Sequence, residues 1–226
     1  MISHEIRAPL NIISIYSKGI RKQVEDENIN ESLKAIEFTT NSLALLANQI
    51  LEFSKNENKQ LELNSRKFDL NNELTGIFNS LRSVVEDFGN KLNITSKLDD
   101  NLTNVFSDPI KIHQLFYNLV GNSNKFTSNG NISIQIDSTL KDSKYVNLKV
   151  IITDNGNGIT GDDLKNIFKE YHQGTISQNV SNMGVGLGLN LCREIIELYN
   201  GKIDVKSKYG VETIVSFNLL LPLSDY

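Results

Sequence analysis

The chain has 226 residues, of which 39% are hydrophobic, and a formal net charge of −4 at pH 7. This composition suffices for the core of one large or two small domains, and the acidic balance excludes a general nucleic-acid binder, which would need a basic surface. No run of about 18 apolar residues occurs, and the N-terminus lacks a charged-then-apolar pattern, so we expect no membrane contact by this part of the chain.

The N-terminal segment contains the first candidate for chemistry, a histidine beside a carboxylate. His4 is followed directly by Glu5, and Pro9 lies about one helical turn further on. A neutral imidazole can attack phosphorus through one nitrogen when an acceptor holds the proton of the other, and Glu5 is the nearest acceptor in the sequence. His4 is therefore a candidate nucleophile, and the alternative is an ordinary solvated histidine.

Two amphipathic segments at the start of the chain predict a helical hairpin. Apolar and small residues recur at steps of three and four over residues 10–20 and again over residues 31–58, and the polar residues 25–28 separate the two stripes. Two helices cannot enclose such a seam alone, so a second copy of the chain is the simplest partner. We therefore expect a homodimer whose core is a four-helix bundle.

From about residue 63 onward the pattern changes to mixed helix and strand. Asp108 followed by Pro109 is a helix-start signal, because aspartate caps a helix and proline fits its first position. The pattern predicts helices over residues 68–86, 109–126 and 187–199, and strands over residues 92–98, 131–137, 146–153, 202–207 and 212–220. We expect an α+β fold with a helical hairpin domain over residues 1–62 and an α/β sandwich with a mixed or antiparallel sheet over residues 63–226.

Two glycine-rich tracts in the second domain point to a planar or phosphorylated ligand. Residues 154–158 read Asp-Asn-Gly-Asn-Gly after a predicted strand, and glycines at this spacing let the backbone approach a ligand closely. Residues 184–189 read Gly-Val-Gly-Leu-Gly-Leu and open a helix, whose first amides can bind phosphate. A tight turn and a flexible loop before a helix remain the structural alternatives for these two tracts.

A pair of asparagines on the helix predicted over residues 109–126 forms a third candidate element. Asn118 and Asn122 are four residues apart and share one helix face, with Lys125 beside them. Amide oxygens suit Mg²⁺, which keeps several waters and bridges phosphates, and a lysine suits phosphate. The alternative is a pair of solvated asparagines on a surface helix.

Five motifs in this order resemble those of the sensor histidine kinases of two-component signalling. They are the phosphoacceptor box at residues 3–11, the asparagine box at 108–127, the first glycine box at 154–159, the phenylalanine box at 167–173 and the second glycine box at 184–189. The resemblance covers essentially the whole chain.

The resemblance implies a Bergerat-type catalytic domain that binds ATP with Mg²⁺. Asp154 would accept a hydrogen bond from the adenine amino group, and Lys125 would contact phosphate. Asn122, with help from Asn118, would ligate the metal, and residues 170–184 would form a mobile lid over the triphosphate. The nucleotide-binding positions carried over in this way are Asn118, Asn122, Lys125, Phe126, Asp154, Gly156, Gly158, Ile159, Tyr171, Gln173, Gly184, Gly186, Leu187 and Gly188.

The resemblance also implies the reaction and the partner. His4 would attack the γ-phosphorus of ATP while Glu5 orients the ring and acts as base, and the phosphoryl group would pass to an aspartate on the receiver domain of a response regulator. The chain would be a cytoplasmic domain of a membrane-anchored sensor. The alternative is a non-catalytic nucleotide-binding or scaffolding module, because Gln173 stands where some relatives have an arginine that contacts the γ-phosphate.

A few positions depart from the family pattern. Ala8 stands where many relatives carry threonine or asparagine on the same helix face as His4, a side chain that positions the water used to dephosphorylate the receiver. We therefore predict kinase activity with weak phosphatase activity. Glu212 replaces a glycine that is usual in the last turn, and we interpret this difference as structural. His113 and His172 have no metal-site companions and are interpreted as a surface residue and a lid residue.

Overall fold

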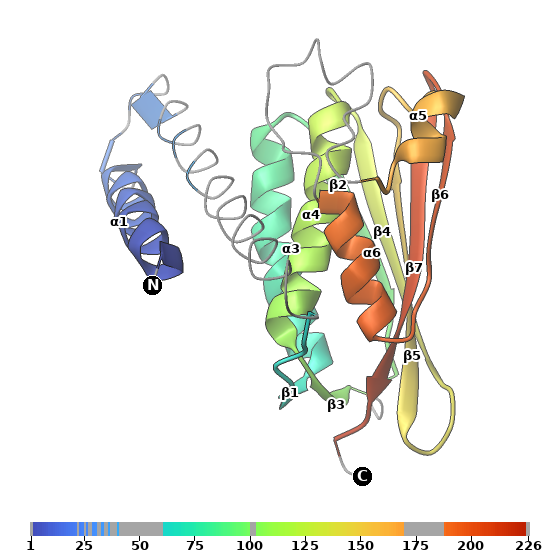
Figure 1. Ribbon diagram of the computed structural model, residues 1–226. Helices are drawn as coiled ribbons and strands as arrows, with labels where there is room; N and C mark the ends of the chain where they lie inside the picture. The colour runs from blue at the N-terminus through green and yellow to red at the C-terminus, as the bar shows by residue number, and fades with distance from the viewer. Residues whose placement is uncertain are drawn as a thin grey trace. The chain divides into compact units, whose positions relative to one another are not determined.

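The structure is a computed structural model that describes residues 2–21, 23–24, 26, 29–30, 33, 36, 40, 61–99, 103–169 and 188–224 (Figure 1). The chain divides into two compact units, Met1–Gln60 and Leu61–Tyr226. In the first unit, α1 spans Ile2–Arg21 and continues through Pro9. The second helix expected over residues 31–58 lies almost wholly outside the described residues. Among the helices that the structure describes, none is both long and apolar enough to cross a membrane.

The second unit is a helix-covered sheet, and its helices and strands are interspersed along the chain. Their bounds are β1 Arg66–Asp69, α3 Leu70–Asp87, β2 Lys91–Lys97, β3 Asn104–Ser107, α4 Pro109–Phe126, β4 Asn131–Leu140, β5 Tyr145–Asp154, α5 Gly161–Asn166, α6 Gly188–Leu198, β6 Ile203–Lys208 and β7 Glu212–Pro222. The predicted α+β class with a mixed sheet is confirmed.

The main sheet has five strands in the order β2-β4-β5-β7-β6. Strand β2 pairs with β4 in parallel, and the other three pairs are antiparallel. A second, two-stranded sheet joins β1 to β3. Helices α3, α4 and α6 lie together on one side of the main sheet (Figure 1). The architecture is therefore a two-layer sandwich of helices on a sheet.

The core lies between these two layers. Strand β5 alternates buried and outward residues, with Val146, Leu148, Val150 and Ile152 facing the helices. From α4, the fully buried Phe116 meets Phe78 of α3 and Phe217 of β7 edge-on, with ring centroids 5.5 and 6.1 Å apart. Each such side chain stabilises the fold by about 1.5–3 kcal/mol through burial. This packing fixes α4, which carries four of the candidate site residues, Asn118, Asn122, Lys125 and Phe126.

The predicted element bounds are correct for α4 and wrong at the start of α3. Asp108 caps α4 by accepting hydrogen bonds from the N–H groups of Ile110 and Lys111 at 2.9 and 3.2 Å, as its position before Pro109 predicts. Helix α3 begins at Leu70 because Asp69 caps it. Phe68, predicted as helical, instead pairs with Val105 in the small sheet. The short elements β1, β3 and α5 were not predicted.

Candidate nucleotide-binding site

Asp154 is a buried carboxylate at the end of the central strand β5. Its side chain is 4% exposed, and its Oδ1 accepts a hydrogen bond from the Gly156 N–H at 3.1 Å. Burial raises the pKa of this carboxyl, while hydrogen bonds from the Ser123 hydroxyl and the Gly156 N–H partly oppose that rise. On β7 the cross-strand neighbour of Asp154 is Thr213, which is also buried. A carboxylate placed in this way can accept a further hydrogen bond from a ligand's amino group.

The loop after Asp154 packs so closely on neighbouring backbone that only glycine fits at two positions. A Cβ at Gly156 would collide with the Phe126 carbonyl oxygen, and one at Gly158 would collide with the Lys208 carbonyl oxygen. Gly158 also has φ +64°, a conformation that favours glycine. The Asn157 N–H donates to the Phe126 carbonyl oxygen at 3.0 Å. The glycine tract therefore packs against the end of α4 and is hydrogen-bonded to it. The spacing of the glycines alone did not predict this contact with α4.

The C-terminal half of α4, whose last residue contacts this loop, carries two amides and a cation. Asn118 is 9% exposed, while Asn122 and Lys125 are half-buried. Asn118 is a hydrogen-bond partner of the Cys192 thiol of α6, and burial is the main cause that raises the pKa of this thiol to about 12. Burial also lowers the pKa of Lys125, whose Nζ lies 5.1 Å from the centroid of the Phe126 ring. Asn118 therefore joins two helices, whereas Asn122 and Lys125 keep surface for a ligand.

These residues fit a nucleotide whose phosphates would supply most of the ligands of a bound metal ion. The Thr127 hydroxyl is buried and has no hydrogen-bond partner among the described residues, so an unused polar group lies beside the glycine loop. No group of three or more histidine, cysteine, aspartate or glutamate side chains in the described part of the chain could hold a metal alone. Magnesium needs only one or two protein oxygens when phosphates supply others. The half-buried amide of Asn122 can meet that requirement.

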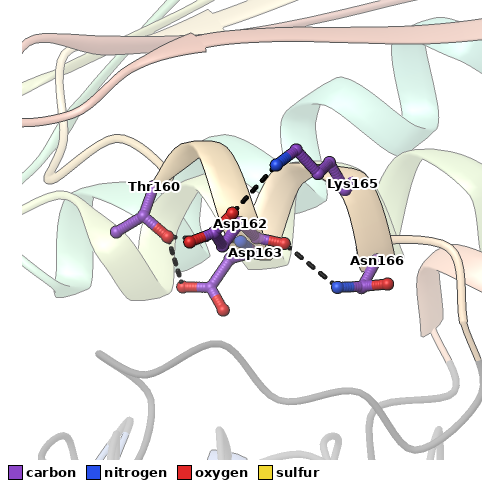
Figure 2. Close-up of polar contacts among 5 residues, drawn as sticks. All are labelled: Thr160, Asp162, Asp163, Lys165 and Asn166. Atoms are coloured by element: carbon purple, nitrogen blue, oxygen red, sulfur yellow. Dashed lines mark hydrogen bonds and ion pairs between the residues drawn. The ribbon is translucent and has the colours of Figure 1, made fainter.

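Helix α5 follows the glycine loop and is built from short-range polar contacts (Figure 2). Thr160 caps it: its Oγ1 accepts from the Asp163 N–H at 3.2 Å and donates to Asp163 Oδ2 at 2.9 Å. Lys165 pairs with Asp162 at 2.9 Å, and both side chains are largely exposed. After α5, the Phe168 ring lies 5.7 Å from Arg193 Cζ of α6. Phe168, one of the described residues of the candidate phenylalanine motif, therefore lies against α6.

The remaining candidate residues are placed only in part. His4 and Glu5 lie in the first two turns of α1, and their side chains are outside the description. Tyr171, Gln173, Gly184, Gly186 and Leu187, with His172, lie outside the described residues. Gly188 is the first residue of α6, and the Ile159 N–H donates to Ser207 Oγ at 2.9 Å.

Two neighbours of Asp154 were missed from the sequence, and one histidine of α4 is less exposed than a fully solvated residue. Ser123 and Thr213 both border Asp154 and were not singled out, although Ser123 directly follows the candidate ligand Asn122. His113, interpreted as a surface residue, is half-buried and stacks on Tyr117 with ring centroids 4.3 Å apart. Burial lowers the pKa of His113, and Glu73 partly opposes the shift.

Two family models match the chain. Residues 107–224 match the family of histidine kinase-, DNA gyrase B- and HSP90-like ATPases, and residues 1–59 match the His Kinase A phospho-acceptor domain. The signal transduction histidine-protein kinase BarA of Escherichia coli is 32% identical over 225 residues, which are 99% of this chain and 24% of BarA. The hybrid signal transduction histidine kinase L of Dictyostelium discoideum is 34% identical over 233 residues, covering 98% of this chain and 13% of that kinase.

Solved structures show the same fold. Full-length ShkA in complex with AMPPNP matches 98% of this chain and 45% of its own with a TM-score of 0.65 and 20% identity. The Acinetobacter baumannii histidine kinase AdeS matches 97% of this chain and 98% of its own with a TM-score of 0.58 and 22% identity. The chain spans about a quarter or less of the length of the two curated relatives described above.

Proposed function

The chain belongs to the sensor histidine kinases, since its two parts match their phospho-acceptor and ATPase families, and we propose that it uses ATP and Mg²⁺ to phosphorylate its own His4. One observation carries the proposal. The buried acceptor Asp154 and the glycine loop lie against the end of α4, whose amides and Lys125 can meet phosphates, in the same chain as the His4–Glu5 pair.

Each residue has a distinct role in this mechanism. When bound, ATP supplies the phosphoryl group, and Mg²⁺ offsets the charge on its phosphates. Asp154 would accept a hydrogen bond from the adenine amino group, which a purine carrying a carbonyl at that position could not donate. Lys125 would contact phosphate. Asn122, with help from Asn118, would ligate the metal.

His4 is the proposed nucleophile. One ring nitrogen would form a bond to the γ-phosphorus as the bond to the bridging oxygen breaks and ADP leaves. Glu5 would hold the other nitrogen's proton and so keep the attacking nitrogen's lone pair free. The product would be phosphohistidine.

The partners follow from the two parts of the chain. We propose that residues 1–62 form a homodimeric four-helix bundle and residues 63–226 the catalytic domain. Helix α1 supports the first point, because five large apolar side chains are exposed among those that the structure describes in it, Ile12, Ile13, Ile15, Tyr16 and Ile20, which a second copy could cover. The phosphoryl group would pass to an aspartate on the receiver domain of a response regulator. The whole protein would be a longer sensor that holds this part in the cytoplasm.

The test is incubation of the chain with γ-labelled ATP and Mg²⁺, followed by treatment of the protein with alkali or acid. Label that survives alkali and is lost in acid is expected, and the His4→Gln variant should carry none while still binding ATP. His113→Gln is the matched control, because this histidine lies on α4 beside Tyr117 and should leave the labelling unchanged. Absence of label from the unmodified chain, despite measurable ATP binding, would instead support a non-catalytic nucleotide-binding or scaffolding module.

A further inference from the structure

Asn90, in the short connection between α3 and β2, is a buried side chain with several hydrogen bonds. It is 2% exposed. Its Nδ2 donates to Asn124 Oδ1 at 2.8 Å and to the Thr127 carbonyl oxygen at 2.9 Å, and its Oδ1 accepts from the Gly130 N–H at 2.8 Å. A buried amide with its donors and acceptor used is rigid, because each alternative position would leave a polar group unpaired.

The segment that Asn90 holds is the tight turn from α4 to β4. Within it, Asn129 has φ +49°, a left-handed backbone conformation that asparagine adopts more readily than most other residues. On the other side, a Cβ at Gly89 would lie 2.8 Å from Asn129 Oδ1, so the two connections pack directly on each other. Asn90 therefore fixes the turn at both of its ends, through Thr127 and Gly130.

The first end of the turn leads to the glycine loop through α4. Thr127 follows Phe126, whose carbonyl oxygen accepts the Asn157 N–H at 3.0 Å. The same carbonyl oxygen occupies the space where a Cβ of Gly156 would be. A shift of the Thr127 backbone would therefore move the surface on which Gly156 and Asn157 rest.

The second end leads to the same loop through β4. Gly130 precedes Asn131, whose N–H donates to Asn155 Oδ1 at 2.7 Å and whose carbonyl oxygen accepts the Asn155 N–H at 3.3 Å. A Cβ at Gly130 would collide with Asn155 Oδ1, so Gly130 and Asn155 are closely packed and neither can shift toward the other. Asn155 is the residue directly after Asp154.

We propose that Asn90 is a positioning residue of the nucleotide site, which sets the place of the loop at residues 154–158 by holding the turn at residues 127–130. It touches no nucleotide itself and lies outside every motif of the phosphate and adenine site. The inference rests on the proposed function, because it concerns the same site. In the nucleotide-free chain, Asn90 keeps the loop in its binding-competent arrangement.

The expected effect on affinity follows from the fraction of molecules in which the loop has its binding-competent arrangement. If loss of the Asn90 side chain leaves the loop competent for about a tenth of the time, the apparent Kd for ATP rises about tenfold. A purely structural asparagine would lower the melting temperature without changing the Kd of the molecules that remain folded.

The experiment compares Asn90→Ala with Tyr199→Phe in the full chain. Tyr199 is a matched control, because its buried hydroxyl bonds Ser107 Oγ at 2.9 Å and the Asp108 N–H at 3.3 Å at the opposite end of α4. Titration calorimetry with Mg²⁺ and ATP, at a temperature where both variants are folded, should give about a tenfold weaker Kd for Asn90→Ala and a change under about twofold for Tyr199→Phe. Equal affinities for Asn90→Ala and the unmodified chain would overturn the inference.

A second measurement needs no nucleotide and separates this inference from the proposed function. Amide hydrogen exchange of residues 155–158 in the nucleotide-free protein should be faster in Asn90→Ala and unchanged in Tyr199→Phe. Unchanged exchange in Asn90→Ala would overturn the positioning role even if the chain bound no ATP. If Asn90→Ala does not fold, Asn124→Ala removes only one of the bonds and should show the same exchange pattern more weakly.

Discussion

Replacing Gly156 by alanine should weaken both the fold and ATP binding. The added Cβ would collide with the Phe126 carbonyl oxygen and would lie 2.7 Å from Thr127 Oγ1 and 2.9 Å from the Phe126 carbonyl carbon. Two of these three neighbours are backbone atoms, and the carbonyl is also the acceptor for the Asn157 N–H at 3.0 Å. The collision can be relieved only if the loop moves away from α4 and gives up that hydrogen bond.

The magnitude follows from these two costs. A hydrogen bond that is lost costs about 1 kcal/mol, and overpacking of a filled site costs about 1–3 kcal/mol. The free energy of unfolding should therefore fall by about 2–4 kcal/mol, which lowers the melting temperature of a domain of this size by roughly 5–15 °C. Because the displaced loop carries the residues next to Asp154, the Kd for ATP should rise by at least about tenfold.

Thermal unfolding and titration calorimetry on the same samples test both expectations. Gly76→Ala is the control, because Gly76 lies in α3 with nothing within 4 Å of an added Cβ. That substitution should stabilise the protein by about 0.5–1 kcal/mol and leave the Kd unchanged. A Gly156→Ala variant that melts and binds ATP like the unmodified chain would refute the close packing of the loop on α4.

Three other substitutions test separate parts of the site and surface. Burial raises the pKa of Asp154, so the protonated carboxyl stabilises the fold below its unfolded pKa, and this stabilisation is lost as the pH rises through the folded pKa. Asp154→Asn should therefore raise the melting temperature at neutral pH, and the difference from the unmodified chain should disappear in acid. The same substitution should abolish ATP binding. Melting curves across the acidic range, with calorimetry at neutral pH, check both effects. Ala8→Thr should speed the dephosphorylation of a phosphorylated receiver, measured as the decay of its label; brisk decay caused by the unmodified chain would contradict the prediction. Lys165→Met removes an exposed ion pair with Asp162, so the free energy of unfolding, measured by denaturant titration, should change by less than about 1 kcal/mol.

Helices with strong local signals could be predicted from the sequence, and short strands could not. Asp108 and Pro109 mark the start of α4 by their own chemistry, and the predicted bounds are those observed. Strands β1 and β3 have four residues each, too few to show alternation, and they form only because distant segments pair. The apolar spacing of α3 extends back to Phe68, so the pattern predicted helix there while pairing with Val105 made a strand.

The same distinction applies to the candidate site. Asp154 and its glycines form a compact motif in the sequence, and the structure brings this motif to the end of α4. Thr213 borders Asp154 only because β5 and β7 pair in this register. Asn90 bonds Gly130 across 40 positions of sequence. Roles that depend on such long-range contacts leave no trace in local spacing, so they could be found only from the structure.

Helix α4 is held by buried side chains at both ends. A substitution at each end therefore tests whether the glycine loop is positioned by its immediate neighbours or by the helix as a whole. At its N-terminal end Asp108 Oδ2 accepts the Asn64 N–H at 2.9 Å, and the Tyr199 hydroxyl bonds the adjacent backbone. At its C-terminal end Asn90 holds Asn124 and Thr127. The 18 residues of α4 place these ends about 27 Å apart. If α4 shifted as a rigid rod, Tyr199→Phe would change the Kd for ATP as much as Asn90→Ala does. The core around Phe116 fixes the helix between its ends, so a change at Tyr199 should stay at the N-terminal end, whereas a change at Asn90 should reach the glycine loop through the turn at residues 127–130.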